Sequence, residues 1–153
     1  MEIEINATYG QICLFDPGLK HPINDWDQEH ERQGFTWRPG SVSFAVPDKD
    51  GDWLFRVEMG KFSRDPSLTY RRITSVPFTI SERGVEIGGV FLSQVYDLAE
   101  GDYNLTYSLI ESNDSLQGAL QFGKTDKPDE ARIHLKDELI DPPAQLKMTA
   151  VPA

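Results

Sequence analysis

The chain has 153 residues, 39% of them hydrophobic and 26% charged, and its 25 Asp and Glu against 15 Lys and Arg give a formal net charge of −10. This length is typical of a single domain that buries a core without a disulfide or metal, and the single Cys13 excludes an internal disulfide. The negative charge argues against unaided binding to nucleic acid, because phosphates would repel it, and the apolar runs are too short to span a membrane.

The N-terminus shows no targeting segment. The sequence MEIEINATYG has neither the basic region nor the apolar region of a signal peptide. Together with the unpaired cysteine, this predicts a cytoplasmic location.

The first predicted element is a polar loop over residues 17–34, which would hold at most one short helix over 25–33. Asn24 or Asp25 would cap the start of this helix, and Gly34 would end it. The segment also concentrates negative charge around one aromatic side chain. These residues are Asp25, Trp26, Asp27, Glu29 and Glu31.

Alternation of apolar and polar side chains then predicts β-strands. It occurs in four segments: 41–46, 53–59, 76–80 and 103–109. The Asp-Gly pair in 47–52 predicts a hairpin between the first two segments, and 81–84 predicts a second hairpin that joins 71–80 to 85–92.

The alternation is weaker in the last part of the chain. Residues 112–132 are polar and turn-rich, which predicts a long loop with short extended pieces. Leu146, Met148 and Ala150 would form an edge strand before the chain frays. We therefore expect one β domain over 1–141 and a Pro-containing tail over 142–153. The fold class predicted is all-β, either an antiparallel β-sandwich or a small barrel.

No constellation of residues indicates catalysis. His21, Asp25, Asp27 and His30 lie within ten residues, which leaves a divalent-metal site open beside the simpler interpretation of a solvated loop. Cys13 lies in the apolar run ICLF and is expected to pack as a small hydrophobic residue. There is no G-x-S-x-G nucleophile elbow. We therefore expect no catalytic residue, no metal and no cofactor.

Two further patterns have structural interpretations. Asp48, Asp50 and Asp52 resemble the start of a calcium loop, but Trp53 and Met59 stand where such a loop needs Gly and Glu, so we expect a hairpin turn. His134, in the run IHLK, is expected at an exposed strand position.

An ordered set of short motifs resembles one known family. The motifs, in chain order, are Tyr9, Phe15-Asp16, Asp25-Trp26, Gly34-Phe35-x-Trp37-Arg38-x-Gly40-x-Val42-Ser43-Phe44, Arg72-Ile73-x-x-Val76-Pro77-Phe78, Gly84 and Gly101-Asp102-Tyr103-x-Leu105. In this order they resemble the competence protein J family over roughly 9–110, with no clear counterpart for 112–153. The resemblance implies an intracellular inhibitor of the DNA-entry nuclease, which is a divalent-metal-dependent enzyme.

Charge and resemblance lead to the same hypothesis. A nuclease that holds DNA offers a basic groove, and an acidic protein can occupy that groove without catalytic residues. We therefore expect a non-catalytic, immunity-type inhibitor whose partner is a basic protein, a DNA-degrading nuclease or a similar toxin. The residues expected to contact the partner are Asp25, Trp26, Asp27, Glu29 and Glu31, and in a second region Asp129, Glu130, Asp137 and Glu138.

Alternative interpretations remain open. Trp26, Phe35 and Trp37 would, in the simplest case, pin the long loop onto the sandwich, whereas an exposed Trp26 would act as an interface anchor. A β-sandwich could also bind a small ligand or carbohydrate, with Trp26, Trp37 and Trp53 as stacking faces. A third interpretation is a domain whose edge strands pair in a homodimer.

Overall fold

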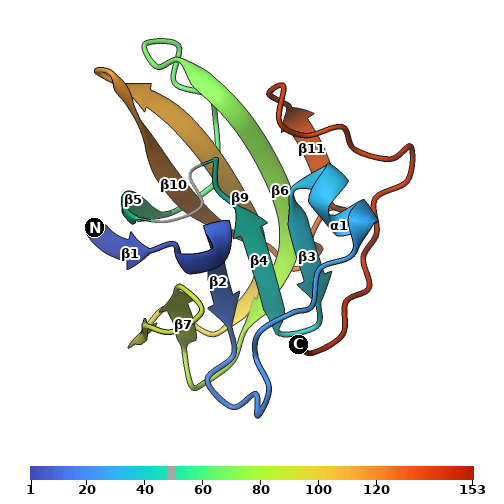
Figure 1. Ribbon diagram of the computed structural model, residues 1–153. Helices are drawn as coiled ribbons and strands as arrows, with labels where there is room; N and C mark the ends of the chain where they lie inside the picture. The colour runs from blue at the N-terminus through green and yellow to red at the C-terminus, as the bar shows by residue number, and fades with distance from the viewer. Residues whose placement is uncertain (48–50) are drawn as a thin grey trace.

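The computed structural model, which describes residues 1–47 and 51–153, is a sandwich of two β-sheets (Figure 1). Sheet A has six strands in the order β1-β5-β10-β9-β6-β11, and sheet B has five in the order β3-β4-β2-β7-β8. The elements are β1 (Glu2–Asn6), the 3-10 helix η1 (Thr8–Gly10), β2 (Gln11–Phe15), α1 (Gln28–Gln33), β3 (Phe35–Arg38), β4 (Ser41–Ala45), β5 (Asp52–Met59), β6 (Tyr70–Ile80), β7 (Val85–Gly88), β8 (Ser93–Tyr96), β9 (Gly101–Ser112), β10 (Ser115–Lys124) and β11 (Arg132–Leu135). The predicted all-β class is confirmed. Among the described residues, no helix has the length and apolar character needed to cross a membrane.

The inner faces of the two sheets share one hydrophobic core. Phe44 of sheet B stacks on Tyr107 of sheet A with ring centroids 4.5 Å apart. The indole N–H of Trp37 donates across the sandwich to the carbonyl of Pro77 at 2.7 Å. Cys13 is buried as expected, and this burial raises the pKa of its thiol to about 11. The alternation in the sequence thus identified the inward faces correctly.

The predicted hairpins are wrong in their strand pairing. The turn at 81–84 does form, because the Gly84 N–H donates to the Ser81 carbonyl at 3.0 Å, but β6 lies in sheet A and β7 in sheet B. Likewise, β4 and β5 lie in different sheets, and the turn residues Asp48 and Asp50 predicted between them are outside the described residues. In both cases the two strands lie in opposite sheets and turn their apolar faces toward the shared core.

The loop predicted over 112–132 is also wrong, because it contains β10 near the centre of sheet A. This strand pairs antiparallel with β9 and parallel with β5. Leu120 and Phe122 are buried, and at Gly118 a Cβ atom would lie only 2.2 Å from the ring of Phe55. Because the Phe55 ring leaves no room for a side chain, this inward position is a glycine, which interrupts the alternation of apolar residues that would have predicted the strand.

The C-terminal tail forms no edge strand through Leu146, Met148 and Ala150. Instead it runs along the segment before α1, where the Asp25 N–H donates to the carbonyl of Val151 and the Ala153 N–H to the carbonyl of Ile23, both at 2.8 Å. Leu146 and Met148 pack against the core. The tail and α1 together cover the end of the sandwich at which β3 and β11 are the edge strands (Figure 1).

Candidate functional site

Helix α1 carries the acidic segment that the sequence singled out, and its start differs from the prediction. Asp27, rather than Asn24 or Asp25, is the N-cap: its carboxylate accepts from the His30 N–H at 3.0 Å. The His30 ring completes a capping box, because its Nδ1 accepts from the Asp27 N–H at 3.1 Å. Gly34 ends the helix as predicted, in the left-handed conformation with φ 81°.

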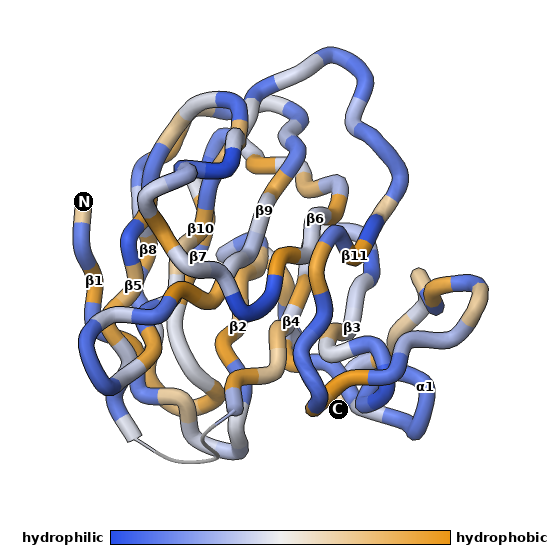
Figure 2. Tube along the Cα trace, turned by 90° about the horizontal axis from the view of Figure 1, so that it is seen from above, coloured by the Kyte–Doolittle hydropathy of each residue, from blue (hydrophilic) through white to orange (hydrophobic). Residues whose placement is uncertain are grey.

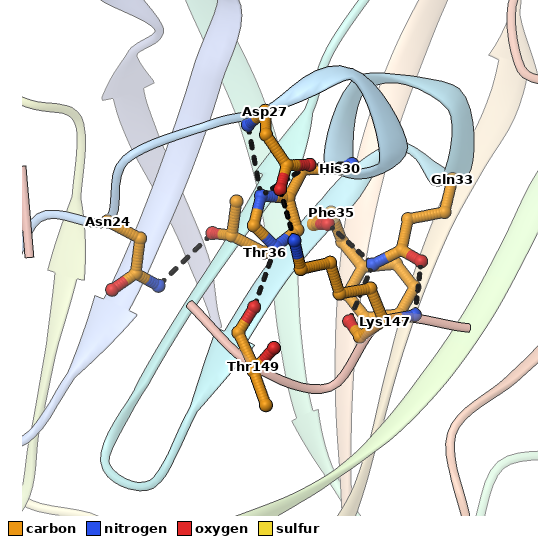
Figure 3. A network of polar contacts seen from close by, with 8 residues as sticks. All are labelled: Asn24, Asp27, His30, Gln33, Phe35, Thr36, Lys147 and Thr149. Carbon is orange, nitrogen blue, oxygen red and sulfur yellow. Dashed lines mark hydrogen bonds and ion pairs between the residues drawn. The ribbon is translucent and has the colours of Figure 1, made fainter. Parts of the chain in front are cut away.

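Two buried side chains of α1 hold the tail (Figure 3). The Nε2 of His30 lies 2.8 Å from the carbonyl of Thr149, and because Nδ1 already accepts from the Asp27 N–H, the tautomer with its proton on Nε2 satisfies both contacts. Gln33 pairs with the backbone of Lys147 in both directions, donating to its carbonyl at 2.9 Å and accepting from its N–H at 2.8 Å. His30 therefore has both nitrogens engaged within the protein.

Asp27 also forms an ion pair with Lys147 of the tail. This hydrogen bond, followed by that from the His30 N–H, lowers the pKa of the Asp27 carboxyl from 3.8 to about 2. Asp27 is thus a helix cap and a tail contact as well as a member of the acidic segment, and Lys147 partly balances its charge.

The other residues of the first predicted contact group reach the surface to different extents. Asp25, Glu29 and Glu31 are exposed, and none of them has an ion-pair partner within the described chain. Trp26 is half-buried: its indole N–H donates to Gln11 at 3.1 Å, and its ring meets the edge of His30. Trp26 thus fastens the loop to β2 and is itself partly exposed.

The second predicted group is divided by the structure. Asp137 is buried, with 5% of its side chain exposed, and forms a two-pronged ion pair with the equally buried Arg72 of β6 at 2.9 and 3.0 Å. Glu130 and Glu138 are exposed. Asp129 is exposed on the loop before β11, where its N–H donates to Asn104 at 2.8 Å.

One acidic residue that the sequence analysis missed joins the helix. The Asp141 N–H donates to the carbonyl of Arg32 at 2.9 Å, and the Arg32 guanidinium approaches the Asp141 carboxylate at 3.7 Å. Beside them, a Cβ atom on Gly34 would lie 3.1 Å from Ile140. The segment 137–141 therefore lies against the C-terminal end of α1, and no local sequence signal indicates this contact. We call Asp25, Asp27, Glu29, Glu31 and Asp141 the acidic helix surface.

The structure offers little support for the alternative sites. Trp53 is buried, with 6% exposed, and Trp37 is half-buried, packs against the core and donates its indole N–H to Pro77. A hollow of about 420 Å³ on the outer face of sheet A is lined by Arg56, Phe62, Tyr70 and Gln121, among others, and by no tryptophan. Within residues 1–47 and 51–153, no group of three or more His, Cys, Asp or Glu side chains is placed to hold a metal.

Fold and surface together define an all-β sandwich in which five exposed carboxylates, those of the acidic helix surface, lie on and beside α1. The chain belongs to the competence protein J (ComJ) family, whose profile matches residues 4–136. The match includes β10 and β11 and so extends beyond the resemblance over 9–110, while residues 137–153 lie outside it.

A solved structure has the same fold. The crystal structure of ComJ from Bacillus subtilis, described as the inhibitor of the DNA degrading activity of NucA, matches with a TM-score of 0.68 and 22% sequence identity. The match covers 82% of this chain and 96% of the Bacillus chain. A comparison with curated protein sequences gave no significant match.

Proposed function

We propose that this protein is a non-catalytic inhibitor that binds a DNA-degrading nuclease and masks its DNA-binding groove. Its membership in the ComJ family, together with the structural likeness to an inhibitor of a DNA-degrading nuclease, carries the proposal. The net charge of −10 supports it, because a surface that holds DNA phosphates is basic and attracts an acidic protein. A cytoplasmic inhibitor of this kind would protect the cell's own DNA from the nuclease.

The acidic helix surface is the proposed contact. Asp25, Glu29 and Glu31 are exposed and without partners in the described chain, so their charges are available to steer a basic partner. Trp26 adds apolar area beside them, in the arrangement of an interface anchor rimmed by charge. Asp137 is left out of the proposed contact because it is buried against Arg72.

Charge reversal tests the proposal. The variant D25K/E29K/E31K leaves the helix cap Asp27 intact, and the control E100K/D114K/D126K changes net charge equally at exposed positions elsewhere. The tagged chain is first used to capture the nuclease from its host's lysate and medium, and DNA degradation by the captured enzyme is then measured. We expect the helix variant to lose at least a factor of about 10 in association rate at low salt, since electrostatic steering raises association rates by orders of magnitude.

The control variant separates local from global charge. If it weakens inhibition as much as the helix variant, the acidic helix surface is not the contact. If the wild-type chain neither captures a nuclease nor slows DNA degradation at low salt or at about 0.5 M salt, the inhibitor proposal itself fails.

A further inference from the structure

The two sheets have four edge strands, and three of them are protected against pairing with another chain. β1 exposes Glu2 and Glu4. β11 has four residues, with Arg132 and His134 exposed and an irregular register. β3 lies beside Asn24, which donates to Thr36 and accepts from Arg38. Charge, shortness and cover are the usual protections of an edge strand.

β8 is the exception among the described edges. Its sequence, Ser-Gln-Val-Tyr, carries no charge, and Ser93, Gln94 and Val95 are exposed. Both Figure 1 and Figure 2 place this edge of sheet B on the side of the molecule away from α1. Whatever pairs here therefore leaves the acidic helix surface free.

Apolar side chains gather next to this edge. Phe91, Leu92 and Val95 are 70%, 72% and 56% exposed, and Tyr9, 69% exposed, lies against Phe91 with ring centroids 5.8 Å apart. Tyr9 has φ 62°, a conformation that residues other than glycine rarely adopt. Four large, mostly apolar side chains are therefore exposed to solvent around an edge strand. We call Tyr9, Phe91, Leu92 and Val95, with β8, the β8 edge patch.

Charge selects the occupant of this patch. Residues 5–15 and 87–96, which supply all of its residues, are the two longest stretches of the chain without a charged side chain. In a chain of net charge −10, two copies repel each other over most of their surfaces, and here they can approach without placing carboxylates in contact. A basic partner, in contrast, would find nothing to pair with in this patch.

From these observations we propose that two copies of this chain dimerise by antiparallel pairing of their β8 strands about a two-fold axis, independently of nuclease binding. The Gly89 N–H donates to the carbonyl of Leu92, so the alternation of the β7–β8 ladder turns the N–H and C=O groups of Ser93 and Val95 away from β7. In a pairing centred on Gln94, Ser93 of each copy lies opposite Val95 of the other, and these outward groups bond to one another.

The same register places the remaining groups favourably. Leu92 of one copy lies opposite Tyr96 of the other. Glu86 on β7 is the acidic residue beside Val95, and the two copies of Glu86 are separated by three strand spacings, about 14 Å, which exceeds the screening length at physiological salt. Sheet B then continues through both copies as one sheet.

Sedimentation over a range of concentrations tests the dimer. We expect the mass to rise from 17.3 kDa toward twice that value with concentration, and V95K to remain at 17.3 kDa throughout. The control L54K places the same charge at another exposed apolar position, on the outer face of β5, and should dimerise as the wild type does. A wild-type chain that stays monomeric at every concentration, or a dimer that V95K leaves intact, overturns the proposal.

Amide hydrogen exchange of the wild-type chain gives a second readout that needs no variant. Exchange at the Ser93 and Val95 amides should slow as concentration rises, because only the dimer protects them, while the Gln94 amide, which faces β7, should not change. Concentration-independent exchange at Ser93 and Val95 would also overturn the proposal.

Discussion

Replacing Asp137 by alanine is the sharpest test of how this fold is held together next to its acidic helix. The Arg72 side chain is 3% exposed, and its guanidinium makes three hydrogen bonds, two to Asp137 and one to the carbonyl of Ala45 at 3.0 Å. D137A removes the only carboxylate paired with Arg72 in the described chain and leaves a buried positive charge without a counter-ion. Breaking a buried pair in this way costs about 3–5 kcal/mol, a large part of the roughly 5–15 kcal/mol that stabilises a domain.

The double variant R72M/D137L tests whether the loss of stability in D137A comes from the unpaired charge of Arg72. It removes both charges, and the Ala45 carbonyl still accepts from the Tyr107 hydroxyl at 2.8 Å. Replacing a whole buried pair by apolar side chains is often close to neutral, so we expect the double variant to recover most of the lost stability. E138A, at the exposed neighbouring carboxylate, is the matched control and should change stability by no more than about 0.5 kcal/mol.

Urea denaturation measures these differences through the midpoint at constant slope. If D137A costs no more than E138A, Asp137 is accessible to solvent and the buried pair is not what joins the segment 137–141 to sheet A. In that case Asp137 would return to the group of residues available to a partner.

Three further predictions concern the helix, its tail and the core. H30A should destabilise the chain by about 1–3 kcal/mol, because it removes half of the capping box and the contact with Thr149. Amide exchange at Lys147 and Ala153 of the tail should become faster in this variant. The control E29A should change neither the stability nor the exchange at these two amides. The stabilisation from Asp27 should be complete above its ordinary pKa of 3.8 and fade as pH falls toward about 2, and an NMR titration that finds 3.8 in the folded chain would contradict the ion pair with Lys147. Cys13, with its pKa raised to about 11 by burial, should resist thiol reagents at mildly alkaline pH until denaturant unfolds the chain, and rapid labelling of the native protein would show that the core around β2 opens easily.

The sequence by itself determined the class of the fold and the location of the charge. Period-two alternation depends only on which side chains are apolar, so it identified the inward faces of β4, β5, β6 and β9 and the burial of Phe44 and Phe55. Gly34 ended the helix as predicted, because the left-handed conformation there is a local preference. The exposure of Asp25, Glu29 and Glu31 likewise followed from their own chemistry.

Only the tertiary structure decided which strands pair and which charges are free. β6 and β7 are adjacent in sequence yet lie in different sheets. The sequence did not predict β10, because its inward position 118 is a glycine, and the ring of Phe55 on β5 leaves no room there for a side chain. Asp137 and Glu138 are neighbours of the same charge, but only Asp137 pairs with the buried Arg72, which lies 65 residues earlier in the chain. Glu138 is exposed to solvent. Lys147 and Asp141 reach α1 from the far end of the chain. Such contacts depend on the packing of distant segments against a common core, which local composition does not encode.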